Sequence, residues 1–399
     1  MTSYNVLVIE TALSGHRGEY VRWIVQALLE SNHKVILALP DDALNHQSIL
    51  NLNHPMLKVE AFDNELLVES FKWIKRLGLF GNDYLYYRLF KILFLRVKQH
   101  QTLDRVFIPF IDHALYSISI LGSPFGDCPF SGITMRPDFH YRAVGVNAPD
   151  RKGAWFKEFI FDRFLKKDTL SSLLTLDEAL HHYYRTKTSH QLQFLPEPAN
   201  FIKPDILTTK RVEFELGITS ESKIILVYGS LTKRKGVINL LKAMLQLDES
   251  YDFQVILAGK ADDDINSELN DEKYAPFIQS NKLLRIDRFI TTEEERVLFS
   301  VAYCCWLGYI GHYRASGVLI QACVYNLPVL ATNEGIIGWQ VEKHDLGILI
   351  DTYSVVDIED AIRDMLCNED SYYIYKDNTK KAFLENTFEN AKKIIANSL

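Results

Sequence analysis

The sequence predicts an α/β protein built from two Rossmann-like domains, and three observations support this fold class. Strand-like apolar runs alternate with helix-length amphipathic stretches from end to end, which is typical of parallel sheets with crossover helices. The 399 residues exceed one typical core and suit two domains. Residues 5–39 and 223–259 also share one order of features: strand, glycine-containing loop, amphipathic helix, strand.

The predicted strands form two sets along the chain. The first set lies at 5–10, 33–39, 105–110, 132–135 and 171–176, and the second at 223–229, 253–259, 282–286, 304–308 and 327–332. Between them, Pro196 and Pro198 remove backbone donors and disfavour a helix or a central strand. We therefore expect a first domain over 1–200 and a second over 201–375.

The composition is that of an ordinary folded protein, with 47% apolar and 24% charged residues. A net charge of −7 argues against a nucleic-acid partner. Five cysteines show no zinc-like spacing, and their odd number suits a reducing compartment; Cys304 and Cys305 are expected in the core. The first residues show no basic leader, and no run of about 18 apolar residues occurs. We therefore expect a cytoplasmic protein.

The loop after the first strand contains Gly15, His16 and Gly18. Glycines allow close approach of a ligand to the backbone, and the helix that follows favours negative charge at its start. A tight strand-to-helix turn is the alternative interpretation. The loop is not the GxGxxG of a dinucleotide fold, so NAD is not expected as a cofactor.

A second loop, Gly229–Gly236, places Lys233, Arg234 and Lys235 directly before a helix expected from Val237. Positive charge is unfavourable there because the start of a helix is itself positive. The loop therefore predicts a bound anion, with a solvated basic turn as the alternative.

A third loop, "YIGHYRASGVLIQA" at 309–322, leads into a helix expected over 318–325. Ser316 is expected to cap this helix and Gly317 to clear space for a ligand. The N–H groups of Ser316, Gly317 and Val318 are then predicted partners of an anion, and Arg314 adds a cation. A plain helix cap is the alternative.

With these loops in order, the chain resembles the GT-B glycosyltransferases, in particular family 4. The second loop is similar to that family's "GRLxxxKG", the third together with "LPVLATNEG" to its "EGFGLPxLEAxAxGxPVIAS", and "FLPEPANF" to its hinge. The resemblance implies two facing Rossmann-like domains with a cleft between them. It also implies a helix over 376–399 that packs back on the first domain.

The resemblance implies a nucleoside-diphosphate-sugar donor, UDP- or GDP-linked, and no metal or other cofactor. Lys235 matches the family's diphosphate-binding lysine, and Ser230 stands where the family has an arginine. Two motif glutamates match Tyr313 and Gln321, so both carboxylates are replaced, and Gln321 keeps a hydrogen-bonding group for a ribose hydroxyl.

The segment "ITMRPDFH" stands where the family has a histidine near the reacting sugar. Arg136 takes that position, and a guanidinium there would stabilise the charge of a leaving group. A reaction that needs a base would use Asp112, His113 or His140. A structural role is the alternative for each of these residues.

Residues 70–100 carry seven Lys or Arg and one Asp, a local charge of +6, together with eight aromatic residues. A basic, aromatic-rich segment is typical of contact with an anionic membrane surface, here the inner face of the cell membrane. The alternative is helices that pack their apolar faces on the first sheet. The membrane interpretation predicts a lipid-linked acceptor.

The leading functional prediction is transfer of a sugar to a glycan, lipid-linked or small-molecule acceptor. A non-hydrolysing sugar-nucleotide epimerase and a non-catalytic nucleotide-sugar-binding module are the alternatives. No metal is predicted, because the acidic run at 262–264 follows a loop-like pattern and is expected to be solvated.

Overall fold

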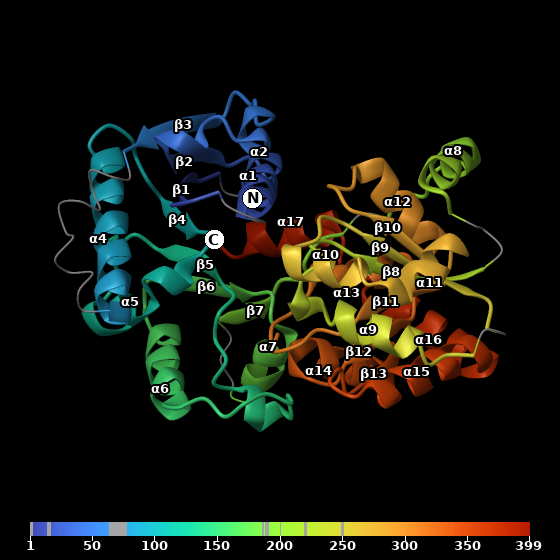
Figure 1. Ribbon diagram of the computed structural model, residues 1–399. Helices are drawn as coiled ribbons and strands as arrows, with labels where there is room; N and C mark the ends of the chain where they lie inside the picture. Colours follow the sequence, from blue (N-terminus) through green and yellow to red (C-terminus); the bar gives the residue numbers. More distant parts are fainter. Residues whose placement is uncertain are drawn as a thin grey trace. The chain divides into compact units, whose positions relative to one another are not determined.

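A computed structural model of the chain describes residues 3–13, 17–63, 78–185, 187, 191–199, 201–218, 222–248 and 251–399 (Figure 1). The chain divides into two compact units. The first comprises Met1–Val144, Asp150–Pro198 and Asn386–Leu399, and the second comprises Gly145–Pro149 and Ala199–Glu385.

The first unit contains a parallel sheet of seven described strands in the order β3-β2-β1-β4-β5-β6-β7. The strands are β1 (Asn5–Ile9), β2 (Lys34–Pro40), β3 (Leu57–Phe62), β4 (Arg105–Ile108), β5 (Phe130–Thr134), β6 (Leu170–Thr175) and β7 (Leu192–Phe194). Its helices are α1 (Arg17–Glu30), α2 (Gln47–Leu50), α4 (Gly78–Lys98), α5 (Leu115–Leu121), α6 (Ala154–Leu165), α7 (Glu178–Arg185) and α17 (Phe388–Asn397).

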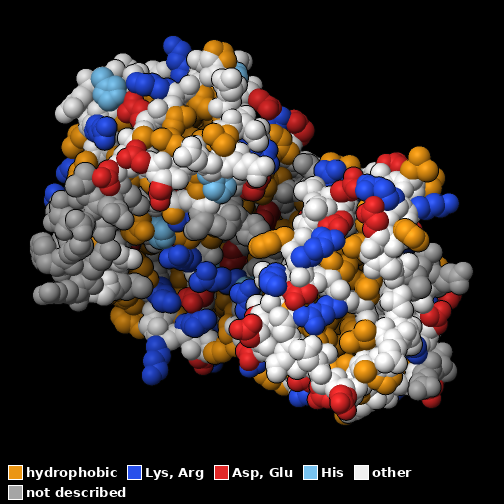
Figure 2. Space-filling model, turned by 45° about the horizontal axis from the view of Figure 1, so that its top comes forward, with side chains coloured by type: hydrophobic (Ala, Val, Ile, Leu, Met, Phe, Trp, Pro, Cys, Tyr) orange, Lys and Arg blue, Asp and Glu red, His pale blue; other side chains and the backbone are white. Residues whose placement is uncertain are grey.

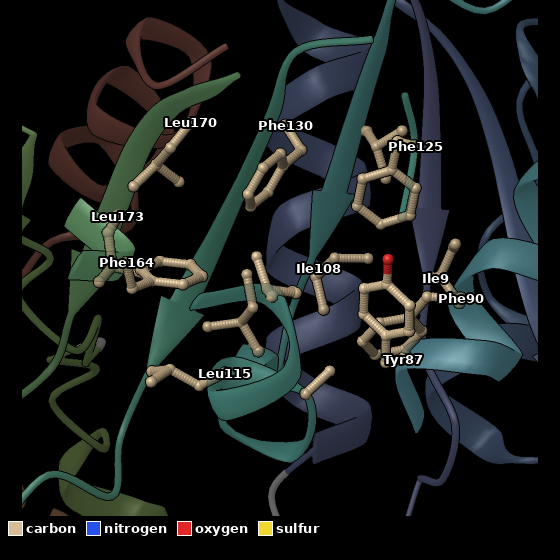
Figure 3. Close-up of a cluster of buried hydrophobic side chains, with 14 of the residues drawn as sticks. Ile9, Tyr87, Phe90, Ile108, Leu115, Phe125, Phe130, Phe164, Leu170 and Leu173 are labelled. Atoms are coloured by element: carbon tan, nitrogen blue, oxygen red, sulfur yellow. The ribbon is translucent and has the colours of Figure 1, made fainter. Parts of the chain in front are cut away.

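Two hydrophobic clusters cover the two faces of this sheet. One joins the strands to α4, α5 and α6, and Figure 3 shows Phe90, Leu115 and Phe164 from these helices pointing toward Ile108 and Phe130 of the sheet. The other joins the opposite side chains of the strands to α1 and α17. Strands covered on both faces read as continuous apolar runs, which is why they were predictable from sequence.

The helix expected over 376–399 is two helices. The first, α16 (Glu369–Ala382), belongs to the second unit, and α17 begins after Thr387, whose side chain accepts a hydrogen bond from the Asn390 N–H. The end of the chain is fixed to the first sheet, because the Ser131 hydroxyl donates to the Ser398 carbonyl. Only α17 therefore packs on the first unit.

The second unit contains a parallel sheet of six described strands in the order β10-β9-β8-β11-β12-β13. The strands are β8 (Lys223–Tyr228), β9 (Phe253–Ala258), β10 (Leu283–Ile286), β11 (Cys304–Leu307), β12 (Val329–Thr332) and β13 (Gly347–Ile350). Its other helices are α8 (Ile206–Leu216), α9 (Val237–Met244), α10 (Asp263–Leu269), α11 (Ala275–Gln279), α12 (Thr292–Val301), α13 (Gly317–Val324), α14 (Gly335–His344) and α15 (Val355–Cys367).

This sheet is also covered on both faces. Side chains of α9, α10 and α15 pack on one face, and those of α12, α13 and α14 on the other. Cys304 and Cys305 are fully buried in β11, as predicted. The predicted α/β class with two Rossmann-like sheets is confirmed.

The basic, aromatic-rich segment is described only from residue 78 onward, so its first residues lie outside the described part. From there, α4 contributes Tyr87, Phe90 and Phe94 to the first hydrophobic core. Its one acid, Asp83, is also buried, and its carboxylate accepts the N–H groups of Tyr116 (3.0 Å) and Ser117 (2.6 Å) at the start of α5. Packing on the sheet therefore accounts for most aromatic residues of α4. No helix among the described residues is long and apolar enough to cross a membrane.

Candidate active site

In the second unit, the candidate site lies at the carboxyl ends of β8 and β11. These strands are neighbours, but the chain continues from β8 to one side of the sheet and from β11 to the other. Open α/β sheets bind ligands at such a topological switch point, where the strand order reverses. The loops concerned are 229–236 and 308–316, the second and third loops of the sequence analysis.

A buried chain of polar groups connects the two loops. The Lys235 ammonium donates to the Tyr228 carbonyl and to the Tyr309 hydroxyl, 3.3 Å away. The Tyr309 hydroxyl lies 3.1 Å from the Ser316 hydroxyl, and all three side chains of Lys235, Tyr309 and Ser316 are buried. Lys235, the lysine predicted to hold a diphosphate, therefore points toward the start of α13. Its side chain is largely shielded from solvent.

The two loops also approach at the backbone. The Ile310 N–H donates to the Arg234 carbonyl (2.7 Å), and the Trp306 indole donates to the Lys235 carbonyl (2.8 Å). Gly236 has a φ of 65°, and a Cβ there would lie 2.1 Å from the Gly308 carbonyl oxygen. Only glycine fits this position, so the helix α9 begins against the loop after β11.

His312 lies among the cations of both loops. Burial lowers its pKa, and the positive charges of Arg234, Arg314 and Lys235 lower it further. Its ring packs beside Tyr309, with centroids 5.1 Å apart. Because Arg234 and Arg314 have exposed side chains, the two loops together present positive charge to solvent.

Other members of the predicted set have different environments. Lys233 is exposed and forms an ion pair with Asp264 of α10 at 3.0 Å. The positive charge of Lys233 is therefore already balanced by a carboxylate of the chain. Ser230 is exposed after β8. The acidic run at 262–264 is the start of α10 rather than a loop, because the Asp262 carboxylate accepts the Ile265 N–H and caps the helix.

The helix α13 starts at Gly317, one residue before the expected start. Ser316 occupies the cap position, but its side chain makes no capping bond because its hydroxyl meets Tyr309 instead. Gly317 is exposed, and Val318 and Gln321 are partly exposed. N–H groups in the first turn of a helix lack intrahelical acceptors, so those of Gly317 and Val318 are suited to an anion.

In the first unit, aromatic and charged groups gather where β1, β4 and β5 end. Glu10 is almost completely buried, pairs with Arg17, and accepts the N–H groups of Thr11 (2.6 Å) and Ala12 (3.2 Å). Burial raises the pKa of Glu10. The guanidinium groups of Arg17 and Arg136 each lie 4.8 Å from the centre of the Phe110 ring.

Asp112 and His113 lie beside this group. The Asp112 carboxylate accepts the Thr134 hydroxyl (2.5 Å) and the Met135 N–H (2.7 Å), so it fixes the backbone that leads to Arg136. Burial raises the pKa of Asp112. His113 packs between the rings of Tyr86 and Phe110, and burial, with Arg17 and Arg136, lowers its pKa to about 3. The imidazole is therefore neutral at physiological pH.

His140 is fully buried and is not available to a substrate in this arrangement. Its Nε2 lies 3.1 Å from a carboxylate oxygen of Asp177, which also accepts N–H groups at the start of α7. The aromatic rings of Phe139, Tyr141 and Tyr183 surround the imidazole. These contacts support a structural role.

The predicted first-unit loop is described only in part, because Gly15 and His16 lie outside the described residues. Gly18 lies in α1, where a Cβ would come within 2.7 Å of the His46 ring. Its small size therefore serves the packing of α1 on residues 46–48. Across the described residues, no group of three or more His, Cys, Asp or Glu side chains is arranged to hold a metal ion.

Five residues of these two groups were not predicted from the sequence: Tyr309, His312, Glu10, Arg17 and Phe110. Tyr309 and His312 lie in the quoted third loop, and Glu10 directly follows an apolar strand, where a buried acid is unusual. The position of Glu10 could therefore have identified it as a candidate site residue. Phe110 had no signal, because only the fold brings Arg17 and Arg136 to its ring.

Several solved structures and one family model are similar to this chain. A glycosyltransferase from Rickettsia africae aligns with 99% of this chain and 97% of its own, at 13% identity and a TM-score of 0.69. HepE from Anabaena, solved with UDP and glucose, aligns over 98% of both chains at 13% identity and a TM-score of 0.62. WaaG, a glycosyltransferase of lipopolysaccharide biosynthesis, aligns over 98% of both chains at 14% identity and a TM-score of 0.60. At such identities the likeness establishes the fold, which is GT-B.

Residues 222–368 match the family model described as "Glycosyl transferases group 1". The fold and this match over part of the chain support an enzyme of the GT-B glycosyltransferase type. The matched residues contain β8, β11 and α13, and therefore the candidate site of the second unit. No sequence among curated proteins matches this chain.

Proposed function

We propose that the protein transfers a sugar from a UDP- or GDP-linked donor to a glycan, lipid-linked or small-molecule acceptor, without a metal ion or other cofactor. The observation that carries the proposal is the basic group formed by loops 229–236 and 308–316 at the start of α13. Arg234 and Lys235 belong to the first of these loops and Arg314 to the second, and the Ile310 N–H donates to the Arg234 carbonyl, so the two loops are in direct contact. HepE, which has the same fold, was solved with UDP and glucose.

In this proposal, Arg234, Arg314 and the first N–H groups of α13 bind the diphosphate. Guanidinium groups form strong, often bidentate bonds to phosphate oxygens and do not need a metal as mediator. Lys235 holds Tyr309 and Ser316 in place and adds its charge at short range. Gln321 is proposed to contact the ribose.

Arg136 is proposed as the first-unit group that stabilises charge at the reacting sugar. It is exposed at the end of β5, and Asp112 fixes the backbone that leads to it. Asp112 is therefore proposed as a positioning residue.

A thermal-shift screen with UDP-, GDP-, ADP- and dTDP-sugars tests the proposal. We expect a UDP- or GDP-sugar to raise the Tm, with equal stabilisation in EDTA. Stabilisation without turnover of any acceptor would favour a non-catalytic module, and the absence of stabilisation by every donor would contradict the proposal.

We also propose that the first unit contacts an anionic membrane surface at the cytoplasmic face. In α6, Trp155 and Phe159 are 74% and 57% exposed, and Ile120 and Leu121 at the end of α5 are likewise exposed. Arg163 of α6 is exposed, and its Nε donates to the Ser119 carbonyl of α5 (2.8 Å), so the two helices that expose these apolar side chains are joined by a hydrogen bond. Figure 2 shows that apolar side chains reach the molecular surface among charged ones.

Liposome flotation tests this surface. We expect the protein to float with anionic vesicles and not with neutral ones, and the Trp155→Ala/Phe159→Ala variant to float less. Phe214→Ala, which removes an exposed ring from α8 of the second unit, is the matched control. Equal flotation with both vesicle types would contradict the proposal.

A further inference from the structure

The turn before α14 holds the backbone of Glu334 in a fixed position. The Glu334 N–H donates to the Thr332 hydroxyl (3.2 Å). On either side, the Asn147 side chain donates to the Asn333 carbonyl (3.2 Å), and the Gly335 N–H donates to the Asn147 carbonyl (2.7 Å). The point from which the Glu334 side chain extends is therefore well defined.

This turn packs directly on the loop of the candidate site. Gly335 has a φ of 67°, and a Cβ there would lie 2.5 Å from the Tyr313 Cα. The Ile336 N–H donates to the Tyr313 carbonyl (3.1 Å). Glu334 thus neighbours the residue that stands where the resembling family has its first motif glutamate.

One oxygen of the Glu334 carboxylate has no partner within the described chain. Its Oε2 is buried and accepts no hydrogen bond, and the side chain does not cap α14. A buried carboxylate oxygen without a donor is unfavourable, so this oxygen is suited to a donor that the described chain does not supply. Sugar hydroxyl groups are donors of the kind that a carboxylate binds, whereas a diphosphate would be repelled.

We propose that Glu334 supplies, from the loop after β12, the carboxylate that positions 313 and 321 lack, and that it binds a hydroxyl group of the donor's sugar. The inference rests on the proposed function, because it requires a nucleotide-sugar in the second unit. It assigns sugar recognition to Glu334 and diphosphate recognition to the cations of the other two loops.

Calorimetry with pairs of ligands separates these roles. Each nucleoside diphosphate, UDP or GDP, is titrated beside its sugar conjugates into the wild type, Glu334→Gln and Glu342→Gln. Glu342 is an exposed acid of α14, the helix that Glu334 precedes, and serves as the matched control. We expect Glu334→Gln to bind the diphosphate within about two-fold of the wild type and the nucleotide-sugar about ten-fold more weakly. Glu342→Gln should leave both affinities unchanged.

A second variant tests the relocation itself. Adding Tyr313→Glu to Glu334→Gln returns a carboxylate to the family's position and should recover part of the affinity for the nucleotide-sugar. Unchanged sugar binding in Glu334→Gln, or an equal loss for diphosphate and nucleotide-sugar, would overturn the inference while leaving the proposed function intact. A wild type that binds no nucleoside diphosphate would instead contradict the proposed function, and the inference would fall with it.

Discussion

Lys235 and Arg234 are neighbours in one loop, yet the structure gives them different environments. Lys235 is buried and bonds to Tyr228 and Tyr309, whereas Arg234 has an exposed side chain and a backbone carbonyl that accepts the Ile310 N–H. The sequence predicted that both are cations of a phosphate-binding loop. It could not show which ammonium or guanidinium points inward, because that depends on β11 and the loop after it.

We expect Lys235→Ala to lower both the Tm and the affinity for a nucleoside diphosphate, because it removes a charge and leaves two buried oxygens without their donor. Arg234→Ala should weaken binding about ten-fold and leave the Tm unchanged. Calorimetry and thermal unfolding of the two variants check this difference. Equal Tm losses would show that Arg234 is also structural.

Asp83 gives a prediction about pH. Burial, partly offset by hydrogen bonds from Ser117 and Tyr116, raises its pKa from 3.8 to about 6. The folded protein therefore binds this proton more tightly than the unfolded chain, so Asp83 lowers the free energy of unfolding as pH rises from about 4 to about 6. The loss amounts to about 2 to 3 kcal/mol.

Asp83→Asn removes this titration. Relative to the wild type, the variant should gain stability between pH 4 and pH 7, as measured by the Tm at each pH. Asp127→Asn, at an exposed position of the same unit, is the control. A difference between Asp83→Asn and wild type that stays constant with pH would contradict the prediction.

At the scale of elements, the strands predicted from apolar runs are all present, and the three that escaped prediction are short or lie at sheet edges. The edge strand β3 has exposed Lys58 and Val59, so it lacks the continuous apolar pattern of the central strands. The strands β7 and β13 have three and four residues. Central strands are recognisable because both faces are covered, whereas of the four edge strands only β10 was predicted.

The contact between the loop after β8 and the loop after β11 gives a prediction for one glycine. Gly236→Ala places a methyl group against the Gly308 carbonyl in addition to the strain of a positive φ, and should lower the free energy of unfolding by more than about 2 kcal/mol. Gly217→Ala has a similar φ of 73° with no atom within 4 Å, so it should show the backbone strain alone, about 1 kcal/mol. Equal effects of the two substitutions on thermal unfolding would show that the loop contact is unimportant.

At the scale of the whole molecule, the two units repeat one plan that the sequence already showed. Each parallel sheet reverses strand order beside its first strand, and each gathers cations at the carboxyl ends there: Arg17 and Arg136 in the first unit, Arg234 and Arg314 in the second. The order of strands, loops and helices was predictable because it follows from the local alternation of apolar runs and amphipathic stretches in the sequence. The environments of Tyr309, His140 and Glu334 were not, since each depends on residues that are distant in sequence.

The central claim is that the basic group of the second unit binds a nucleoside diphosphate without a metal. Calorimetric titration of UDP and GDP in EDTA, into the wild type and an Arg234→Ala/Arg314→Ala variant, tests it most directly. We predict that the wild type binds one of the two nucleotides and that the variant, with an unchanged Tm, binds it at least about ten-fold more weakly. Binding of equal strength in both proteins, or no binding by the wild type, would contradict the claim.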